Sequence, residues 1–265
     1  MSISSRLKFT ARYITFLWRS RTKYGVHSPF VYDLITKVLQ DDTPYPEYQL
    51  VEDIRKQCLK SKRVIEISNY GAIKRKSSLG NELKQVRYIA QAALTPKCGK
   101  LLHRLVKYFA PETILELGTS LAISTIYIAT AAPKATFTTM EGCSTTAEIA
   151  TENLKQAGLH QIKMLIGDFS NSLPRVLSTS KNIGFAFFDG NHTYIATLEY
   201  FNKCLLVGNE NSVFVFHDIH WSVGMEEAWA QICKHPQVTV SIDLFEVGLV
   251  FFRKGLSKQN FVIRF

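Results

Sequence analysis

After residue 112, short apolar runs alternate with longer stretches in which apolar residues recur at helical spacing. The apolar runs predict strands near residues 113–117, 135–140, 161–166, 183–189 and 212–217. The longer stretches predict helices near residues 121–132, 144–157, 171–179, 193–206 and 223–234. Two further apolar runs, 238–244 and 248–253, predict a closing antiparallel pair. The expected fold class is α/β, with a Rossmann-like, mostly parallel, seven-stranded sheet and helices on both of its faces.

The first 95 residues have a different pattern, which predicts a helical and basic extension ahead of a domain spanning 96–265. Helical spacing predicts helices near residues 5–22, 29–39, 47–59 and 82–94, and a further helix at 98–109 within the second domain. The mostly polar stretch 64–80 predicts a loop.

Charge is placed unevenly along the chain. Residues 1–112 hold 21 Lys and Arg against 9 Asp and Glu, which is +12, whereas the remainder holds 11 against 13, which is −2. A solvated basic surface explains this balance, and so does a patch for an anionic substrate, RNA or a membrane surface. No apolar run approaches the roughly 20 residues of a membrane helix, and the five cysteines form no CxxC pair. We therefore expect a cytoplasmic protein without a transmembrane segment.

The first predicted strand of the sheet leads into a turn of small residues. Gly118 would let a ligand approach the backbone closely, and Thr119, Ser120 and Ser124 could donate hydrogen bonds to it. Glu116 closes the strand and joins this candidate cofactor set. The pattern lacks the three glycines of a dinucleotide loop, and an ordinary strand-to-helix turn is the competing interpretation.

The next two strand ends add acidic residues. Glu141, followed by Gly142, stands where a carboxylate would bind the two hydroxyls of an adenosine ribose, which suits NAD as well as S-adenosylmethionine (SAM). Asp168 could accept a hydrogen bond from an adenine amino group, and Phe169 could pack on the ring. The alternatives are a solvated carboxylate at Glu141 and a helix cap at Asp168.

Strands four and five bring carboxylates and histidines to the same edge. Asp189 and His192 follow the fourth strand, and His217 and Asp218 end the fifth. Asp189 and Asp218 could hold Mg²⁺ or another divalent cation. Alternatively, His192 or His217 could act as a general base toward a substrate hydroxyl, which makes both, with Asp189, candidate catalytic residues. A histidine that is buried and hydrogen-bonded is the competing structural interpretation.

Together the strand ends resemble the class I SAM-dependent methyltransferases, in particular the O-methyltransferases related to the catechol and macrocin enzymes. The matching segments are Leu115–Ser120, Met140–Gly142, Gly167–Phe169, Phe188–Tyr194 and His217–Trp221. Val26–Phe30 also resembles an extension of some bacterial members.

This resemblance implies a division of roles within the 96–265 domain. Gly118, Thr119, Ser120 and Ser124 would hold the methionine part of SAM, Glu141 the ribose, and Asp168 with Phe169 the adenine. Asp189 would lie near the methyl donor and, in metal-dependent relatives, would bind the cation with Asp218. The chain departs from both patterns, because Ile219 replaces the asparagine of catechol-type enzymes and His217 replaces the first of two macrocin-type aspartates.

The expected activity is methyl transfer from SAM to the hydroxyl of a small-molecule acceptor, with or without a divalent cation. The alternatives are an RNA O-methyltransferase, an NAD-dependent oxidoreductase and a non-catalytic SAM-binding protein. The basic extension motivates the RNA alternative, although no RNA-binding signature accompanies it. Assembly into a homodimer is compatible with the sequence.

Overall fold

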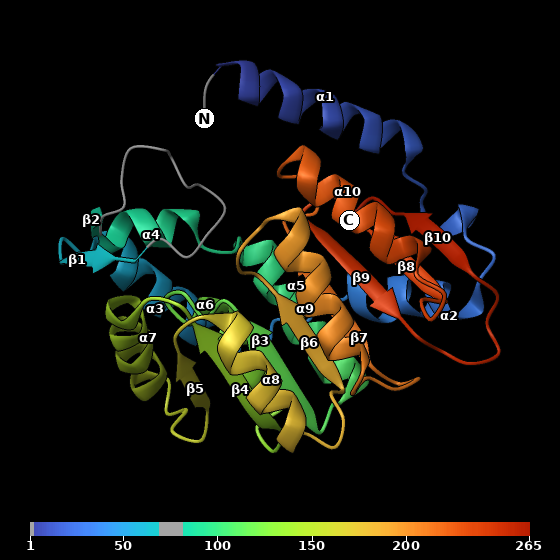
Figure 1. Cartoon of the computed structure of the whole chain (residues 1–265). Helices are drawn as coiled ribbons and strands as arrows, with labels where there is room; N and C mark the ends of the chain where they lie inside the picture. The colour runs from blue at the N-terminus through green and yellow to red at the C-terminus, as the bar shows by residue number, and fades with distance from the viewer. Residues whose placement is uncertain (1–2, 69–81) are drawn as a thin grey trace.

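A computed structural model describes residues 3–68 and 82–265 and has a central sheet with helices on both faces (Figure 1). The strands of the sheet are β3 (Thr113–Leu117), β4 (Thr136–Glu141), β5 (Lys163–Ile166), β6 (Phe185–Phe188), β7 (Val213–His217), β8 (Val240–Asp243), β9 (Val247–Phe251) and β10 (Gln259–Val262). Their order is β10-β8-β9-β7-β6-β3-β4-β5, and every pairing is parallel except the two made by β9. The predicted α/β class and the closing antiparallel pair β8–β9 are confirmed.

The sheet has eight strands rather than the predicted seven. The additional strand is β10, which pairs in parallel with β8 from Gln259 opposite Val240 to Val262 opposite Asp243. No residue of β10 is fully buried, and it begins with the polar pair Gln259 and Asn260. An edge strand of this kind lacks the continuous apolar run by which buried parallel strands are recognised in a sequence.

Two apolar cores lie on the two faces of the sheet. Helices α5 (Pro96–Phe109), α6 (Ile123–Ala131) and α7 (Ser144–Gln156) contribute to one core, and α8 (Phe169–Thr179), α9 (Tyr194–Leu205) and α10 (Val223–Lys234) to the other. Because successive strand residues point to opposite faces, Phe187 packs in the first core and Phe188 in the second. Burial on both faces explains why these strands are apolar almost throughout.

The helices ahead of the sheet are α1 (Ile3–Arg19), the 3₁₀ turn η1 (Lys23–Gly25), α2 (Pro29–Leu34), which continues as the π-helical η2 (Ile35–Leu39), α3 (Glu47–Lys60) and α4 (Val86–Ala92). Helices α2, α3 and α4 contribute to the first core, whereas α1 contacts Phe245 and Glu226. A single apolar cluster runs from Val31 and Ile54 to Phe185 in the sheet. The division of the chain at residue 95 stays a prediction. Within residues 3–68 and 82–265, no helix combines the length and hydropathy that a membrane crossing needs.

The segment around residues 64–85 differs from the prediction. Strands β1 (Val64–Ile67) and β2 (Glu82–Gln85) form an antiparallel ribbon, in which Val64 lies opposite Gln85. The predicted loop is therefore wrong at its start, and the helix predicted from residue 82 begins at Val86. The rest of that loop, 69–80, lies outside the described residues. Pairing between segments so far apart in the chain gives no local periodicity, which is why the ribbon was not predicted.

One glycine shows how closely two helices of the first core approach. A Cβ on Gly99 of α5 would lie 2.3 Å from Cε2 of Tyr127 in α6. We expect Gly99→Ala to lower the free energy of unfolding by about 1–3 kcal/mol through overpacking, as measured by urea denaturation. Gly25→Ala is the matched control, because its Cβ would make only an ordinary 3.6 Å contact with Arg21. Equal stability of the two variants would contradict the tight packing.

Candidate cofactor and active site

One cavity of about 330 Å³ opens at the carboxyl ends of β3, β4, β5 and β6. This edge includes the topological switch point of the sheet. From β3 the chain adds β4 and β5 on one side, and then crosses to the other side of β3 to add β6 and β7. Seven of the residues predicted to bind a cofactor line the cavity: Gly118, Ser120, Glu141, Gly142, Asp168, Phe169 and Asp189. The structure thus brings these strand ends together at one cavity, and their role in cofactor binding stays a prediction.

The turn after β3 depends on glycine at position 118. Gly118 has a φ of 108°, and a Cβ there would lie 2.3 Å from the carbonyl oxygen of Asp189. The amide nitrogens of Gly118 and Thr119 donate to the carbonyl oxygen of Met140 over 2.9 and 3.1 Å. The turn is thus held against the ends of both neighbouring strands, β4 and β6, and a side chain at Gly118 would separate it from Asp189.

Three of the predicted cofactor-binding residues lie beneath this turn. Glu116, Thr119 and Ser124 are buried and do not line the cavity. Ser124 and Thr125 each donate a 2.6 Å hydrogen bond to the Glu116 carboxylate, which Thr139 also contacts at 2.6 Å. Burial raises the pKa of Glu116 to about 7 against the effect of these hydrogen bonds. In this structure the group supports the turn from within the fold.

Glu141 is the carboxylate that faces the turn. Its Oε2 accepts a 2.7 Å hydrogen bond from the amide of Ser120, and its Oε1 accepts a 2.9 Å bond from the amide of Cys143. Burial raises the pKa of Glu141, whereas these backbone donors lower it. Each oxygen of the Glu141 carboxylate is therefore held by one backbone amide, and the residue lines the cavity in a fixed orientation.

Asp168 and Phe169 form the opposite side of the cavity. Asp168 caps α8 by accepting a 2.7 Å hydrogen bond from the amide of Ser170, as the competing interpretation of this residue expected, and it also lines the cavity. The Phe169 ring is buried, and a Cβ on Gly190 would lie 2.7 Å from it. The absence of a side chain at Gly190 therefore provides the space that the Phe169 ring occupies.

The predicted catalytic residues form one cluster beside the cavity. Nδ1 of His217 and Oδ1 of Asp189 are 2.8 Å apart, and Nε2 of His192 lies 3.6 Å from the same oxygen. Asp218 Oδ2 is 3.9 Å from His192 Nε2 and 3.8 Å from His217 Nδ1. Although burial by itself lowers the pKa of His217, the Asp189 and Asp218 carboxylates raise it to about 9. Two carboxylates thus face two imidazoles at the ends of β6 and β7.

Backbone strain is concentrated at the same edge. Ser120, Ala122, Asn191 and Asp218 have φ values between 49° and 62°, in the left-handed region that residues with a Cβ seldom adopt. Two of these residues follow β3, one follows β6 and one follows β7. Strain of this kind costs about 1–3 kcal/mol per residue and is characteristic of functional sites.

Comparison with known proteins identifies this region. A family model described as a methyltransferase domain matches residues 115–219, which include the β3 turn, Glu141, Asp168 and the cluster around Asp189. Residues 115–219 thus resemble a methyltransferase domain. The match ends at Ile219, immediately after Asp218, so all the strand ends of the candidate site lie within it.

Curated relatives of this methyltransferase domain align over short segments. A transmembrane O-methyltransferase homolog of Mus musculus is 36% identical over 84 residues, 31% of this chain and 33% of that protein. The Homo sapiens transmembrane O-methyltransferase is 35% identical over 82 residues, 30% of this chain and 28% of that protein. The matched region thus spans about a third of the length of these relatives.

Solved structures share the fold around the methyltransferase domain. The O-methyltransferase of Bacillus cereus in complex with SAH superposes with a TM-score of 0.59 at 17% identity, covering 84% of this chain and 97% of that chain. An O-methyltransferase of Streptomyces achromogenes involved in tomaymycin synthesis, in complex with SAM, gives 0.53 at 24% identity, covering 61% and 82%. The class I fold expected from the strand-end motifs is confirmed.

A cation-binding role does not fit the donor set of this methyltransferase domain well. Oδ1 of Asp189 is engaged by His217, and the residue after Asp218 is the buried, apolar Ile219. Among the described residues, no three His, Cys, Asp or Glu side chains are arranged to hold a metal ion. A divalent cation at Asp189 and Asp218 stays a prediction, and we assign no chemical step to it.

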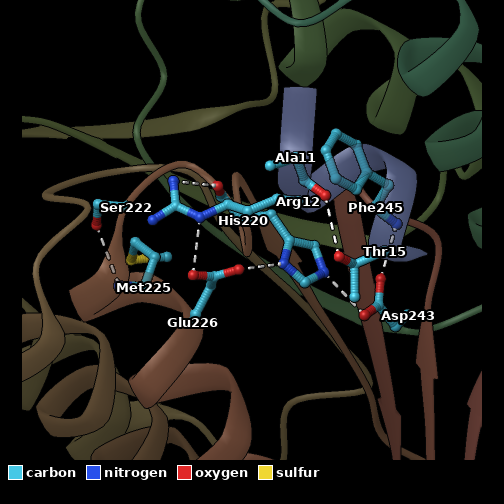
Figure 2. A network of polar contacts seen from close by, with 9 residues as sticks. All are labelled: Ala11, Arg12, Thr15, His220, Ser222, Met225, Glu226, Asp243 and Phe245. Atoms are coloured by element: carbon cyan, nitrogen blue, oxygen red, sulfur yellow. Dashed lines mark hydrogen bonds and ion pairs between the residues drawn. The ribbon is translucent and has the colours of Figure 1, made fainter. Parts of the chain in front are cut away.

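The loop that follows Asp218 is tied to the N-terminal helix, as Figure 2 shows. His220 lies between two carboxylates, 3.0 Å from Oε1 of Glu226 and 2.8 Å from Oδ2 of Asp243. Arg12 of α1 forms a 2.9 Å ion pair with Glu226. The Phe245 ring stacks on His220 and also contacts aromatic side chains of α1. Helix α1 is therefore fastened to the loop that positions Asp218.

Sequence reasoning missed several residues that line the cofactor cavity. They are Ile67, Ser68, Ile89, Cys143, Thr146, Asn191 and Tyr200. Ile67, Ser68 and Ile89 come from the β1–β2 ribbon and α4, which the prediction placed in a loop and a longer helix. Val64-Ile65-Glu66-Ile67 is rich in β-branched residues, but a run this short, interrupted by Glu66, has no clear periodicity that would mark it as a strand.

Proposed function

We propose that this protein transfers the methyl group of SAM to a hydroxyl oxygen of a small-molecule acceptor. The observation that carries the proposal is the junction of two features at Asp189. This residue lines the cavity between Gly118, Glu141 and Asp168, and its carboxylate also contacts both histidines of the adjacent cluster. A cofactor cavity that opens directly onto a set of acid–base groups is the arrangement that group transfer requires.

The cavity fits the parts of SAM as follows. The rigid Glu141 carboxylate is suited to the ribose hydroxyls, and Asp168 with the Phe169 ring is suited to the adenine. The side-chain-free backbone at Gly118 gives the methionine part room beside Asp189. The structures of Bacillus cereus and Streptomyces achromogenes enzymes with SAH and SAM support this assignment. SAM, when bound, supplies a methyl group on a sulfonium that an oxygen nucleophile displaces.

We assign the general base to His192 because its geometry leaves it free to accept a proton. Nε2 of His192 is 3.6 Å from Asp189 and 3.9 Å from Asp218, and its side chain is 25% exposed. His217 is engaged with Asp189 at 2.8 Å and is only 12% exposed. His192 would take the hydroxyl proton as the oxygen–methyl bond forms, and the two carboxylates would stabilise the resulting imidazolium. His217 would hold Asp189 in place.

The surroundings of the cluster favour an acceptor with an apolar or aromatic part. Ile195 is 75% exposed, Trp221 is 42% exposed and Val223 is 60% exposed, and each lies within a few residues of the cluster in sequence. Ile195 is in the first turn of α9, Val223 begins α10, and Trp221 precedes α10 by two residues. The starts of the two helices are adjacent, because a Cβ on Gly224 would lie 3.6 Å from the Cβ of Tyr194. Exposed apolar side chains beside a reactive cluster are typical of a ligand-binding surface.

The proposal is tested first by cofactor choice and then by turnover. Titration calorimetry should show saturable binding of SAM or SAH and none of NAD, because the β3 turn lacks the dinucleotide glycines. Incubation with radiolabelled SAM and a panel of phenolic and aliphatic alcohols should then transfer label. NAD binding would favour an oxidoreductase. Label entering only RNA would favour an RNA methyltransferase, and SAM binding without any transfer would indicate a non-catalytic protein.

Chelation tests the cation separately. Because Oδ1 of Asp189 is engaged by His217, we expect protein treated with EDTA to retain its methyl-transfer activity. Activity is measured before and after chelation, with Mg²⁺ added back as the control. Loss of activity that Mg²⁺ restores would instead support metal binding at the two aspartates.

A further inference from the structure

A second, larger cavity lies between η1, η2, the N-terminal part of α5 and the residues after β10. Its volume is about 870 Å³. It shares no lining residue with the cofactor cavity. Its walls include apolar side chains, among them Ile35, Leu39 and Ile263. The lining residues come from four segments far apart in sequence, which fall within residues 22–24, 35–42, 97–104 and 263–265.

The charged lining of this cavity is almost entirely basic. The basic residues that line it are Lys23, Lys97, Lys100, Arg104 and Arg264. Among the described residues, Asp42 is the one acidic residue along the wall, and the neighbouring Asp41 also interacts with Arg104. Within residues 3–68 and 82–265, none of the five basic side chains is ion-paired with an aspartate or glutamate. Their charges are therefore left largely uncompensated by the protein.

The helical spacing of α5 brings three of the cations together. Lys97, Lys100 and Arg104 are separated by three and four residues, which places them along one face of the helix. Lys97 donates a hydrogen bond to the Phe265 main-chain oxygen, and Lys100 lies over the Tyr48 ring at 5.3 Å. These contacts hold the ammonium groups at the cavity and leave donor capacity unused.

Arg104 provides an independent indication of a ligand. Arg104 is only 8% exposed, although it lines the cavity. Nη1 donates a 2.6 Å hydrogen bond to the carbonyl oxygen of Asp41, but Nε has no partner in the described structure. A buried guanidinium with an unfilled donor is costly unless another group completes its hydrogen bonds. Nε itself is closed to solvent, so an anion in the cavity would contact the guanidinium through Nη2, for which the described structure shows no hydrogen bond.

We propose that this cavity binds the phosphate groups of a small anionic ligand. Guanidinium and ammonium groups together favour phosphate, because Arg matches its oxygens with a planar pair of donors and Lys adds point charge. The apolar wall leaves a place for an uncharged part of the same molecule. A concave site with clustered cations favours a small ligand over the phosphate backbone of RNA, which binds along basic stripes. The site is separate from the proposed methyl-transfer site and does not depend on its activity.

Inorganic pyrophosphate is the probe, because it has no adenosine that could enter the cofactor cavity. Titration calorimetry on the full chain should show saturable binding and a rise in melting temperature with pyrophosphate concentration. The Lys97→Ala/Lys100→Ala double variant should bind at least about tenfold more weakly, since it loses two charged hydrogen-bond donors. Both lysines are at least partly exposed, so their removal leaves the core intact. Lys134→Ala, an exposed lysine outside the cavity, is the control and should bind like the unmodified protein.

A vesicle arm separates two sources of phosphate. Binding to phosphatidic acid vesicles that pyrophosphate displaces would identify a lipid headgroup, whereas pyrophosphate binding without vesicle binding would identify a soluble ligand. Absence of saturable pyrophosphate binding would overturn the proposal. Equal affinity of the double variant and Lys134→Ala would overturn it as well, and so would binding of a single-stranded RNA that pyrophosphate does not displace.

Discussion

Replacing Asp189 by alanine is expected to lower the rate of methyl transfer by about 10²–10⁴-fold, the usual range for loss of a positioned acid–base group. Within residues 3–68 and 82–265, Asp189 is the one residue shared by the cofactor cavity and the catalytic cluster. Its removal takes away the partner of His217 and one of the two carboxylates near His192. Single-turnover transfer of label from SAM measures the chemical step directly.

The variant must fold for this result to be informative. Circular dichroism and urea denaturation check that the Asp189→Ala protein retains its structure, and Glu227→Ala, an exposed carboxylate on α10, controls for the loss of one charge. Binding of SAH should be reduced less than transfer, because Glu141 and Asp168 remain. Full activity of Asp189→Ala would remove the residue from the catalytic assignment.

The second large effect is expected from Glu141→Ala, which should weaken SAM binding by about 10–100-fold. Hydrogen bonds to a charged group contribute about 1.5–3 kcal/mol, and 1.4 kcal/mol corresponds to a factor of ten in affinity. The Glu141 carboxylate also orders the turn through the Ser120 amide, so its loss disturbs the cofactor cavity in two ways. Titration calorimetry with SAH gives the change in dissociation constant.

Glu112→Ala is the matched control for this experiment. Glu112 immediately precedes β3, is exposed, and lies at the amino end of the strand whose carboxyl end leads to the cavity. We expect SAH affinity to be unchanged in this variant. With saturating SAM, Glu141→Ala should transfer methyl groups at close to the original rate. A large loss of maximal rate with unchanged SAH affinity would show that Glu141 acts in the chemical step instead of in binding.

The sequence predicted the strand ends well because a parallel sheet obeys simple geometry. Apolar runs mark its buried strands, and their carboxyl ends meet at one edge, so Glu141, Asp168 and Asp189 could be brought together without a structure. The direction of individual side chains was harder to predict. Ser124 and Thr119 look like ligand donors in the sequence, but the rotation of the first turn of α6 and the course of the β3 turn direct them inward.

What the sequence did not predict depends on contacts between distant segments. The residues that complete the cavity, such as Ile67 and Ile89, reach it only because β1 pairs with β2 and α4 packs on α3. The addition of β10 beside β8 is equally non-local. Neither arrangement leaves a periodic signal in its own stretch of chain. The basic cavity around Arg104 likewise needs four separate segments. In the sequence, its lysines and arginines contribute only to a general excess of basic over acidic residues.

The mixed origin of the cofactor cavity has a thermodynamic consequence. One wall belongs to the turns of the sheet, and the other belongs to the β1–β2 ribbon and α4, which precede the matched methyltransferase domain in the chain. A ligand that contacts both walls must be released before the two parts can separate. Its binding free energy is therefore added to the cost of local opening of the ribbon. Occupancy of the cavity would be recorded in the hydrogen-exchange rates of Val64–Ile67, far from any catalytic group in the sequence.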